Sequence, residues 1–357
     1  MFQKLYDDLL IQVDSALQEF MLDQVRSVEN NPFLHYYYNK VKDYLFNGGK
    51  RFRPILMILS HTSIYPESIS KGIIQASLSL ELLHNASLIH DDIMDNAVIR
   101  RGKRAFHREL RKYAKENYPE KNVNCDDYGL GMGILGGDYV YNLAYKSIHV
   151  DDYPPEVILR ASKEFNEGFL DVVQGVIFET DLMGRYNVSE EEYLEMITGK
   201  TAALFERAAR MGAVFAQGSE SQIECLGNFG RNSGIAFQLV DDIIGTFGDS
   251  EKTGKPVDSD LREGKKTILV IKAFQNATKE QGKRMNEILG KQDATQEEIN
   301  EIRDIIRETG ALDYTHQKAE EFYNISEKYL DEANPTIDSN YKKYLSEIAR
   351  MGVYRVK

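Results

Sequence analysis

The chain of 357 residues carries 44 lysine and arginine residues against 56 aspartate and glutamate residues, which gives a formal net charge of −12. This acidic balance argues against general affinity for nucleic acid or anionic membranes, so an anion-binding site must be local. Because the sequence has only 8 prolines and no Gly/Ser-rich tract, it predicts one large domain over residues 1–357 rather than two or three.

The sequence shows no signal for export or membrane insertion. Its N-terminus is acidic and amphipathic, unlike a signal peptide, and no apolar run reaches the ~18 residues that a transmembrane helix needs. The two cysteines, Cys125 and Cys225, lack metal-ligand spacing and fit a reducing compartment. We therefore expect a cytoplasmic protein without a transmembrane segment.

Helices are predicted from end to end. The first is marked by apolar residues at helical spacing: Leu5, Leu9, Val13, Leu17 and Phe20. A second helix begins at Pro32 and ends before Gly48-Gly49. Residues 69–95 form a long apolar helix, whereas residues 96–128 are irregular or loosely helical, with an exposed polar excursion near 114–128.

The rest of the chain continues the helical pattern. Further helices are predicted over residues 134–149, 155–183, 189–217 and about 221–247. A loop rich in glycine, lysine and aspartate follows at 248–267, and amphipathic helices fill the remainder. Because period-2 alternation is scarce, the predicted fold class is all-α, a single large helical bundle around a central cavity.

Three aspartates at the end of the 69–95 helix are the strongest chemical signal. Asp91 and Asp95 are one turn apart, roughly 5–6 Å between Cβ atoms, so they can share hard divalent cations, with Asp92 beside them. Arg100 and Arg101 follow, and guanidinium groups match phosphate geometry. Mg²⁺ prefers few carboxylates, water and phosphate oxygens, so the stretch predicts a diphosphate site. A solvated acidic helix end is the alternative.

A second acidic pair strengthens this interpretation. Asp241 and Asp242 also end an apolar helix, with Gln238 one turn earlier. Two such clusters can hold two or three Mg²⁺ ions around one diphosphate and neutralise it as a leaving group. The pair is therefore the expected second half of the metal site.

Basic residues and one histidine supply candidate phosphate contacts. Lys50, Arg51 and Arg53 follow paired glycines that let the backbone approach an anion, although a short basic run is commonly a solvated surface. His84 lies two turns before Asp91 on the same helix face, although a lone histidine there is commonly a core residue. Three further lysines and a threonine complete the set: Lys200, Thr201, Lys255 and Lys265.

Together these motifs match a known family. GGKRFRP, DDIMD with RRG after it, GKTA, FQLVDD, GKPV and EGKKT occur in the order of the trans-isoprenyl diphosphate synthases, and the chain resembles the archaeal geranylgeranyl diphosphate synthase type over roughly residues 40–275. The resemblance implies an isoprenoid synthase fold, a homodimer, and Mg²⁺-dependent head-to-tail condensation of isopentenyl diphosphate with an allylic diphosphate.

The resemblance also implies residue roles. Metal ligands would be Asp91, Asp92, Asp95, Asp241 and Asp242, and the catalytic set Asp91, Asp95, Asp241 and Lys200. The allylic diphosphate would contact Arg100, Lys200, Thr201, Gln238, Lys255 and Lys265. Isopentenyl diphosphate would contact Lys50, Arg53, His84 and Arg101.

The chain departs from the family pattern at two positions. The second acidic motif often has a third acidic residue where this chain has Gly245. An aspartate common in the family is replaced by Ile177, for which Glu179 or Asp181 could compensate.

Product length is expected to depend on residues just upstream of Asp91. The tail should pass Ala86 and Ser87 toward Leu83, and short-chain members of the family carry an aromatic residue at this level. None is present here, so the resemblance implies a product of C20 (geranylgeranyl) or longer, and Ala86→Phe should shorten it.

Two other functions share features of this sequence. A class I terpene cyclase also uses an aspartate-rich helix and Mg²⁺ but needs no second diphosphate site, so Lys50, Arg53 and Arg101 argue against it. A non-catalytic regulatory subunit of a prenyl synthase would not need intact acidic motifs, although Ile177 is compatible with one.

Overall fold

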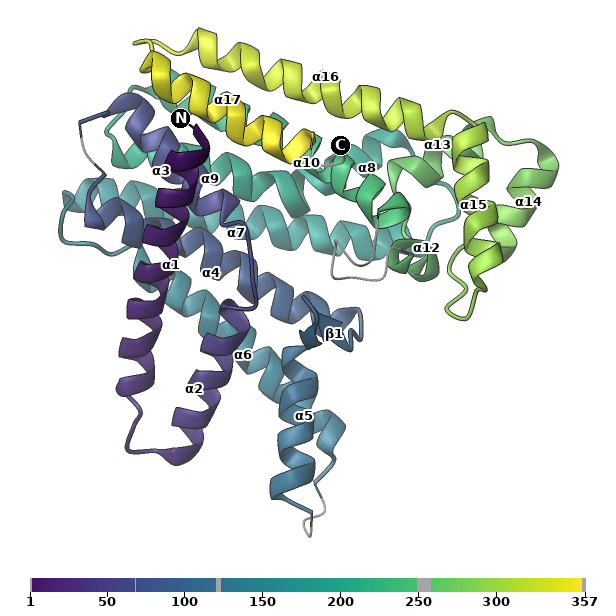
Figure 1. Cartoon of the computed structure of the whole chain (residues 1–357), viewed down its shortest axis with the longest axis horizontal. Helices are drawn as coiled ribbons and strands as arrows, with labels where there is room; N and C mark the ends of the chain where they lie inside the picture. The colour runs from purple at the N-terminus through teal and green to yellow at the C-terminus, as the bar shows by residue number, and fades with distance from the viewer. Residues whose placement is uncertain (1, 68, 120–122, 249–257, 355–357) are drawn as a thin grey trace. The chain divides into compact units, whose positions relative to one another are not determined.

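The computed structural model describes residues 2–67, 69–119, 123–248 and 258–354. Over these residues it confirms the predicted all-α class, since its regular elements are helices and one short hairpin (Figure 1). In the N-terminal part the elements are α1 (Phe2–Arg26), α2 (Pro32–Leu45), α3 (Phe52–Ile64), α4 (Lys71–Met94), β1 (Ile99–Arg100), β2 (Lys103–Arg104), α5 (Phe106–Asn117), α6 (Cys125–Ser147) and α7 (Pro155–Met183). They continue as α8 (Glu190–Ile197), a π-helical turn (Thr198–Ala202), α9 (Ala203–Phe215), α10 (Glu220–Phe247), α12 (Ser259–Glu263), α13 (Ile268–Asn276), α14 (Lys279–Ile288), α15 (Gln296–Glu308), α16 (Ala311–Glu332) and α17 (Ser339–Val353).

The chain divides into two compact units. The first unit comprises Met1–Phe165 and Met211–Gln217, and the second comprises Asn166–Arg210 and Gly218–Lys357. The single domain over the whole chain stays a prediction, and each unit is described in turn. Among the described helices, none combines the length and the apolar composition needed to cross a bilayer.

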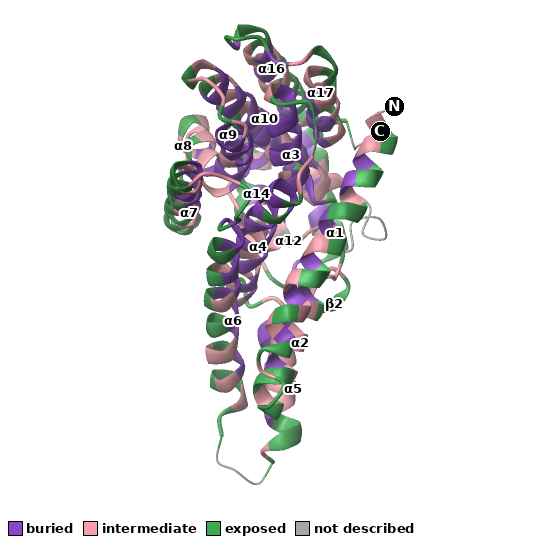
Figure 2. Cartoon of the chain, turned by 90° about the vertical axis from the view of Figure 1, so that its left-hand side faces the viewer, coloured by how far each residue is buried: buried purple, intermediate pink, exposed green. Residues whose placement is uncertain are grey.

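Helix α4 forms the centre of the first unit. It begins where the Ser70 side chain accepts a hydrogen bond from the backbone N–H of Ile73, which satisfies one of the free donors of the first turn. It packs against α1, α3 and α6, and most of its residues are buried (Figure 2). The acidic C-terminal end of α4 is therefore held by a well-packed scaffold.

Helix α6 begins at Cys125, nine residues before the predicted start at 134, so that prediction was wrong. Its N-terminal half contains several glycines, which disfavour a helix when local propensity alone is considered. Packing explains their presence: a Cβ added at Gly136 would lie 2.5 Å from the Phe106 ring, and one at Gly137 would lie 2.1 Å from the His90 ring. The glycines let α6 approach α4 and α5 closely, and this packing outweighs propensity.

The segment 96–128 is more regular than predicted. A hairpin pairs Ile99 with Arg104, and the amphipathic α5 occupies 106–117. The predicted excursion near 114–128 is therefore helical at both ends, and most of its described residues are exposed. Residues 120–122 lie outside the described residues.

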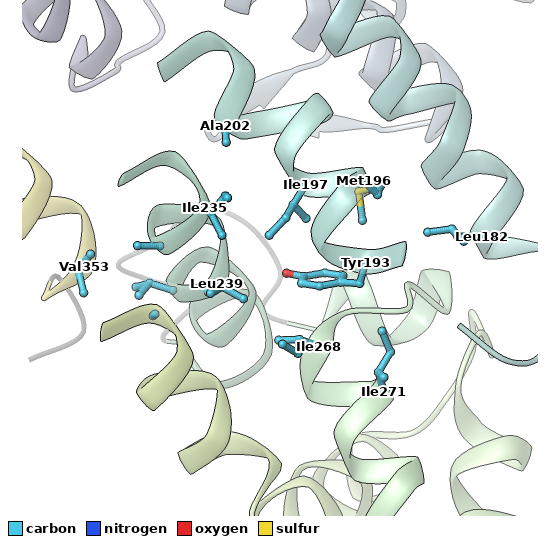
Figure 3. Packing of buried hydrophobic residues seen from close by; sticks show 13 residues of the cluster. Leu182, Tyr193, Met196, Ile197, Ala202, Ile235, Leu239, Ile268, Ile271 and Val353 are labelled. Atoms are coloured by element: carbon cyan, nitrogen blue, oxygen red, sulfur yellow. The ribbon is translucent and has the colours of Figure 1, made fainter. Parts of the chain in front are cut away.

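The predicted helix 189–217 forms three pieces, and the first two of them lie in the second unit. A capping box of Ser189 and Glu192 starts α8, and the GKTA motif forms the π-helical turn that leads into α9. π-Bulges of this kind often mark functional sites. Helices α10, α16 and α17 lie side by side (Figure 1), and buried residues of α8, α10, α13 and α16 form one cluster (Figure 3).

Candidate active site

The first acidic cluster lies at the C-terminal end of α4. Asp91 is partly exposed and Asp95 is exposed, whereas Asp92 is fully buried. The helix ends because Asn96 adopts a φ of 52° and the Asn96 and Ala97 N–H groups donate to carbonyl oxygens of the last turn at 3.1 and 2.9 Å, the pattern of a Schellman motif. Asp91 and Asp95 thus remain accessible one turn apart, as the sequence predicts.

Asp92 has a different environment. Arg100 Nε donates to Asp92 Oδ1 over 2.6 Å, and the Tyr44 hydroxyl donates to Oδ2 over 3.2 Å. Burial, followed by the charge of Asp92, raises the pKa of Tyr44 above its usual value, so the phenol stays a donor. With both oxygens engaged, Asp92 orients Arg100.

The GGKRFRP segment is folded into an anchored loop of the first unit. Arg51 is buried, with its guanidinium 2.6 Å from Glu81 and 2.9 Å from Asp14, so it anchors the loop. Gly48 and Gly49 have φ values of 93° and 147°, which side chains other than glycine rarely adopt. The Arg101 guanidinium donates to the Gly48 carbonyl over 2.6 Å. The structure therefore brings Arg101 to the loop that contains Gly48 and Gly49, the glycine loop, although Gly48 is 53 residues away in sequence.

Cations gather around this loop. Burial lowers the pKa of the Arg101 guanidinium, Glu81 opposes this effect, and the charges of Arg51 and Arg100 add to it. The Lys50 carbonyl accepts a hydrogen bond from the Tyr6 hydroxyl, and Lys50 Nζ lies 5.7 Å from the centre of the Phe52 ring. Cations that lie close together repel one another, and an anion that binds between them relieves this repulsion.

Two further predicted contacts lie on neighbouring helices of the same unit. Arg53 is in the first turn of α3, and His84 is partly exposed on α4. The Ser87 hydroxyl, also partly exposed, donates to the His84 carbonyl over 2.8 Å. By contrast, Ala86 and Leu83 are only 2% and 1% exposed. The candidate residues for product length therefore divide between two faces of α4.

The second acidic cluster lies in the second unit. Asp241 is exposed on α10, whereas Asp242 is buried. Asp242 accepts hydrogen bonds from the Tyr193 hydroxyl and from Gln238 Nε2, the latter over 2.8 Å. Burial, with the charge of Asp260 next, raises the pKa of Asp242 to about 8. Only Asp241 of this pair is open to solvent.

Lys200 and Thr201 lie in the π-helical turn. The Thr201 hydroxyl donates to Gln238 Oε1 over 2.8 Å, and Lys200 Nζ pairs with Glu179. A Cβ at Gly175 would lie 2.1 Å from the Lys200 backbone nitrogen, so α7 and the turn touch through their backbones.

The ion pair of Lys200 also bears on the departure at Ile177. The Ile177 side chain is 65% exposed, and Asp181 pairs with Arg185. Of the two acidic residues that could compensate, Glu179 is the one whose carboxylate contacts Lys200.

The other departure, Gly245, has a structural explanation. A Cβ at this position would lie 2.6 Å from Asp260 Oδ2, so the Asp260 carboxylate occupies the space next to α10 that a side chain would need. Lys265 Nζ lies 3.4 Å from Asp260 Oδ1 and 2.7 Å from Glu263 Oε2. Asp260, on the short helix α12, therefore supplies a carboxylate beside residue 245. Lys255 lies outside the described residues.

We expect Gly245→Asp to lower activity although it restores the common family pattern. The new side chain would displace Asp260 and the lysine paired with it. The expected loss in kcat/KM for the allylic diphosphate that the family resemblance implies is at least about tenfold, which corresponds to about 1.4 kcal/mol, measured by steady-state kinetics. The double variant Gly245→Asp/Asp260→Gly should recover most of the activity, and a fully active single variant would contradict the explanation.

The oxygen ligands fit a hard divalent cation. Within the described residues, no three side chains of aspartate, glutamate, histidine or cysteine converge on one point. In the first unit the carboxylate of Asp91 is partly exposed and that of Asp95 is exposed, and in the second unit the carboxylate of Asp241 is exposed. Mg²⁺ is commonly bound by one or two carboxylates together with water and phosphate oxygens, which matches this donor set.

Tyr44, Tyr193 and Asp260 were not identified from the sequence. The two tyrosines occupy apolar helix faces, where a buried aromatic residue is ordinary core. Asp260 lies 15 residues beyond Gly245 in sequence, and only the glycine itself hinted that a side chain from elsewhere approaches α10.

Comparisons with known proteins identify the family of the chain. Residues 35–306 match the family model described as polyprenyl synthetase. A geranylgeranyl diphosphate synthase of Sulfolobus acidocaldarius is 35% identical over 305 residues, which cover 84% of this chain and 86% of that protein. A geranylfarnesyl diphosphate synthase of Aeropyrum pernix is 35% identical over 314 residues, covering 87% of this chain and 91% of that protein.

A solved structure extends the agreement to the whole fold. The geranylgeranyl pyrophosphate synthase of Corynebacterium glutamicum, complexed with isoprenyl diphosphate and magnesium, superimposes with a TM-score of 0.89. It is 28% identical in sequence, and the match covers 97% of this chain and 98% of that one. The chain therefore belongs to the polyprenyl synthetase family and is a prenyltransferase.

Proposed function

We propose that this prenyltransferase condenses isopentenyl diphosphate head-to-tail with an allylic diphosphate, using Mg²⁺, to give a trans-prenyl diphosphate of C20 or longer. The observation that carries the proposal lies in the first unit. Accessible carboxylates at the end of α4 accompany a cationic group in which Arg101 is bonded to the glycine loop. Carboxylates that hold metal and cations that hold phosphate are the two requirements of a diphosphate reaction.

The proposed roles follow the accessibility of each group. Asp91, Asp95 and Asp241 are the metal ligands, with two or three ions in all. Asp92 and Asp242, buried and hydrogen-bonded, support them. Arg100, Lys200 and Lys265 bind the allylic diphosphate, together with Thr201 and Gln238, and the same role for Lys255, which lies outside the described residues, rests on the family resemblance. The residues for isopentenyl diphosphate are Lys50, Arg53, His84 and Arg101.

The chemistry is ionisation of the allylic C–O bond, attack of the isopentenyl double bond on the allylic carbon to form the new C–C bond, and loss of a proton from the resulting cation, which the released diphosphate accepts. When bound, the metal ions neutralise the diphosphate leaving group. The lysine and arginine side chains stabilise the same developing anion, because preorganised charges at a leaving group lower the barrier. This chemistry requires surroundings that keep water from quenching the carbocation, and it needs no protein nucleophile because the carbocation forms by ionisation.

A product of C20 or longer is supported by the names of the relatives and by α4. The two relatives are geranylgeranyl and geranylfarnesyl diphosphate synthases. Small side chains, Ala86 and Ser87, precede Asp91 by about one helical turn. An elongating tail therefore meets no aromatic barrier from these two residues.

We also propose that the enzyme is a homodimer that associates through α6. Leu130, Ile134 and Leu135 are 44%, 45% and 57% exposed on this helix, and neighbouring apolar side chains in solvent are typical of an interaction surface. Leu135→Glu should produce a monomer in light-scattering chromatography. Ile11→Glu, at a position on α1 that is 64% exposed, should leave the mass unchanged. A Leu135→Glu variant that remains dimeric would exclude this face.

One incubation separates the candidate functions. The protein is supplied with a C15 allylic diphosphate and Mg²⁺, with and without labelled isopentenyl diphosphate, and the products are separated by chromatography. A prenyl diphosphate synthase forms a longer labelled diphosphate only when isopentenyl diphosphate is present. A cyclase would release hydrocarbon in both cases, and a regulatory subunit would form neither product.

A further inference from the structure

Tyr193 carries a polar group into an otherwise apolar cluster of the second unit. Its side chain is 1% exposed and packs with aliphatic residues of α8, α10 and α13. In Figure 3 its ring lies between Ile197 and Ile268, and its oxygen points toward the helix that carries Leu239. That oxygen donates a hydrogen bond to Asp242. A buried hydroxyl is costly without a partner, so this bond explains why a polar tip is tolerated here.

The bond is one end of a chain of four side chains. Tyr193 donates to Asp242 Oδ2, and Gln238 Nε2 donates to Asp242 Oδ1 over 2.8 Å. Gln238 Oε1 in turn accepts from the Thr201 hydroxyl over 2.8 Å. The donor and acceptor assignments are consistent, because each oxygen of Asp242 accepts one hydrogen bond and the Gln238 amide both donates and accepts. The chain joins α8, α10 and the π-helical turn.

We propose that Tyr193 is a positioning residue that fixes Asp241 and Asp242 on α10 relative to the π-helical turn that contains Lys200. Its hydroxyl holds the Asp242 carboxylate, which orients Gln238, and Gln238 holds Thr201 beside Lys200. The inference rests on the proposed function, in which Lys200 and Asp241 engage the allylic diphosphate and its metal. Small misplacements of such groups lower rates strongly.

Tyr193→Phe tests the hydroxyl alone, since phenylalanine keeps the ring in its packed position. The half-saturating Mg²⁺ concentration and the KM for the allylic diphosphate should rise about tenfold, which equals about 1.4 kcal/mol. The KM for isopentenyl diphosphate should change less than twofold. Calorimetric titration of inorganic diphosphate in the presence of Mg²⁺ should show a similar loss of affinity.

Tyr314→Phe is the matched control. The Tyr314 hydroxyl donates to Glu190 over 2.7 and 2.8 Å, so it is also a tyrosine bonded to a carboxylate, and Glu190 begins the helix that carries Tyr193. Its loss should change thermal stability and leave Mg²⁺ dependence and diphosphate affinity unchanged. A general loss of a buried hydrogen bond is thereby separated from loss of positioning.

Thermodynamic coupling between the hydrogen-bonded side chains gives an independent test, which starts from Thr201 instead of Tyr193. Thr201→Val alone should weaken Mg²⁺-diphosphate binding, and combining it with Tyr193→Phe should add less than the sum of the two effects. Thr201→Val with Tyr314→Phe should be additive. If Tyr193→Phe fails to fold, the titration of Thr201→Val with Mg²⁺ and diphosphate is decisive. A Thr201→Val variant that binds diphosphate with wild-type affinity overturns the inference.

The inference and the proposed function fail separately. If Tyr193→Phe matches Tyr314→Phe in Mg²⁺ dependence and diphosphate affinity, positioning by Tyr193 is overturned while condensation stands. If the unaltered enzyme does not condense the two substrates, the proposed function falls. Diphosphate titration still reports on the hydrogen-bonded chain in that case.

Discussion

Asp91→Asn is expected to reduce kcat/KM for condensation by about 10²–10³-fold, the range seen when one group that stabilises transition-state charge is removed. Asp91 is partly exposed at the end of α4, so a metal ion can reach its carboxylate from solvent. Substitution by an amide of equal size should leave the melting temperature nearly unchanged. Steady-state kinetics and thermal unfolding on the same preparation measure both effects.

Asp92→Asn makes the matched comparison at the neighbouring position. Asp92 is buried, and its carboxylate is the partner of Arg100. Loss of one member of a buried ion pair costs about 3–5 kcal/mol because the other charge is left uncompensated. We expect a lower melting temperature together with lost activity. If Asp91→Asn destabilises the fold and Asp92→Asn does not, the roles assigned to the two residues are reversed.

Ser87→Phe is expected to shorten the product. Ser87 lies one turn before Asp91 on the partly exposed side of α4, which it shares with His84. A tail that leaves the metal site along this side would meet the new ring. Chromatography of the products after dephosphorylation should show C15 replacing C20 and longer species. An unchanged product profile would show that the tail does not pass Ser87.

Ala86→Phe should also shorten the product, but at a cost in stability. Ala86 is 2% exposed, so a phenylalanine must displace packed neighbours, which commonly costs about 1–3 kcal/mol. The melting temperature therefore distinguishes the two variants, because only Ala86 is packed in the core. Product length and melting temperature should change together only for Ala86→Phe.

Periodicity was sufficient to predict the long helices. The bounds predicted for α7, 155–183, are those of the structure, and α10 begins within one residue of its predicted start. The early start of α6 was missed because its glycines argue against a helix locally. In the folded protein these glycines leave space for the rings of Phe106 and His90, which pack against α6. Tertiary packing, which local propensity does not contain, decided that segment.

The sequence was sufficient to predict which residue types form the candidate site, but not which hydrogen-bond and ion-pair partners those residues have. Spacing on one helix identified Asp91 and Asp95, because one turn separates them. It could not distinguish Arg101, which is bonded to the glycine loop, from Arg51, which is buried in ion pairs with Glu81 and Asp14. Such partners lie 30 or more residues away in sequence, so only the folded chain reveals them.

We expect the protein to join isopentenyl diphosphate to an allylic diphosphate and to release one diphosphate for each unit added. The most direct measurement counts both: labelled isopentenyl units incorporated and inorganic diphosphate released, with Mg²⁺ and after its removal by chelator. With Mg²⁺ we expect the number of isopentenyl units incorporated to equal the number of diphosphates released, and without Mg²⁺ we expect neither incorporation nor release. Diphosphate released without incorporation, or incorporation that survives chelation, would contradict this expectation.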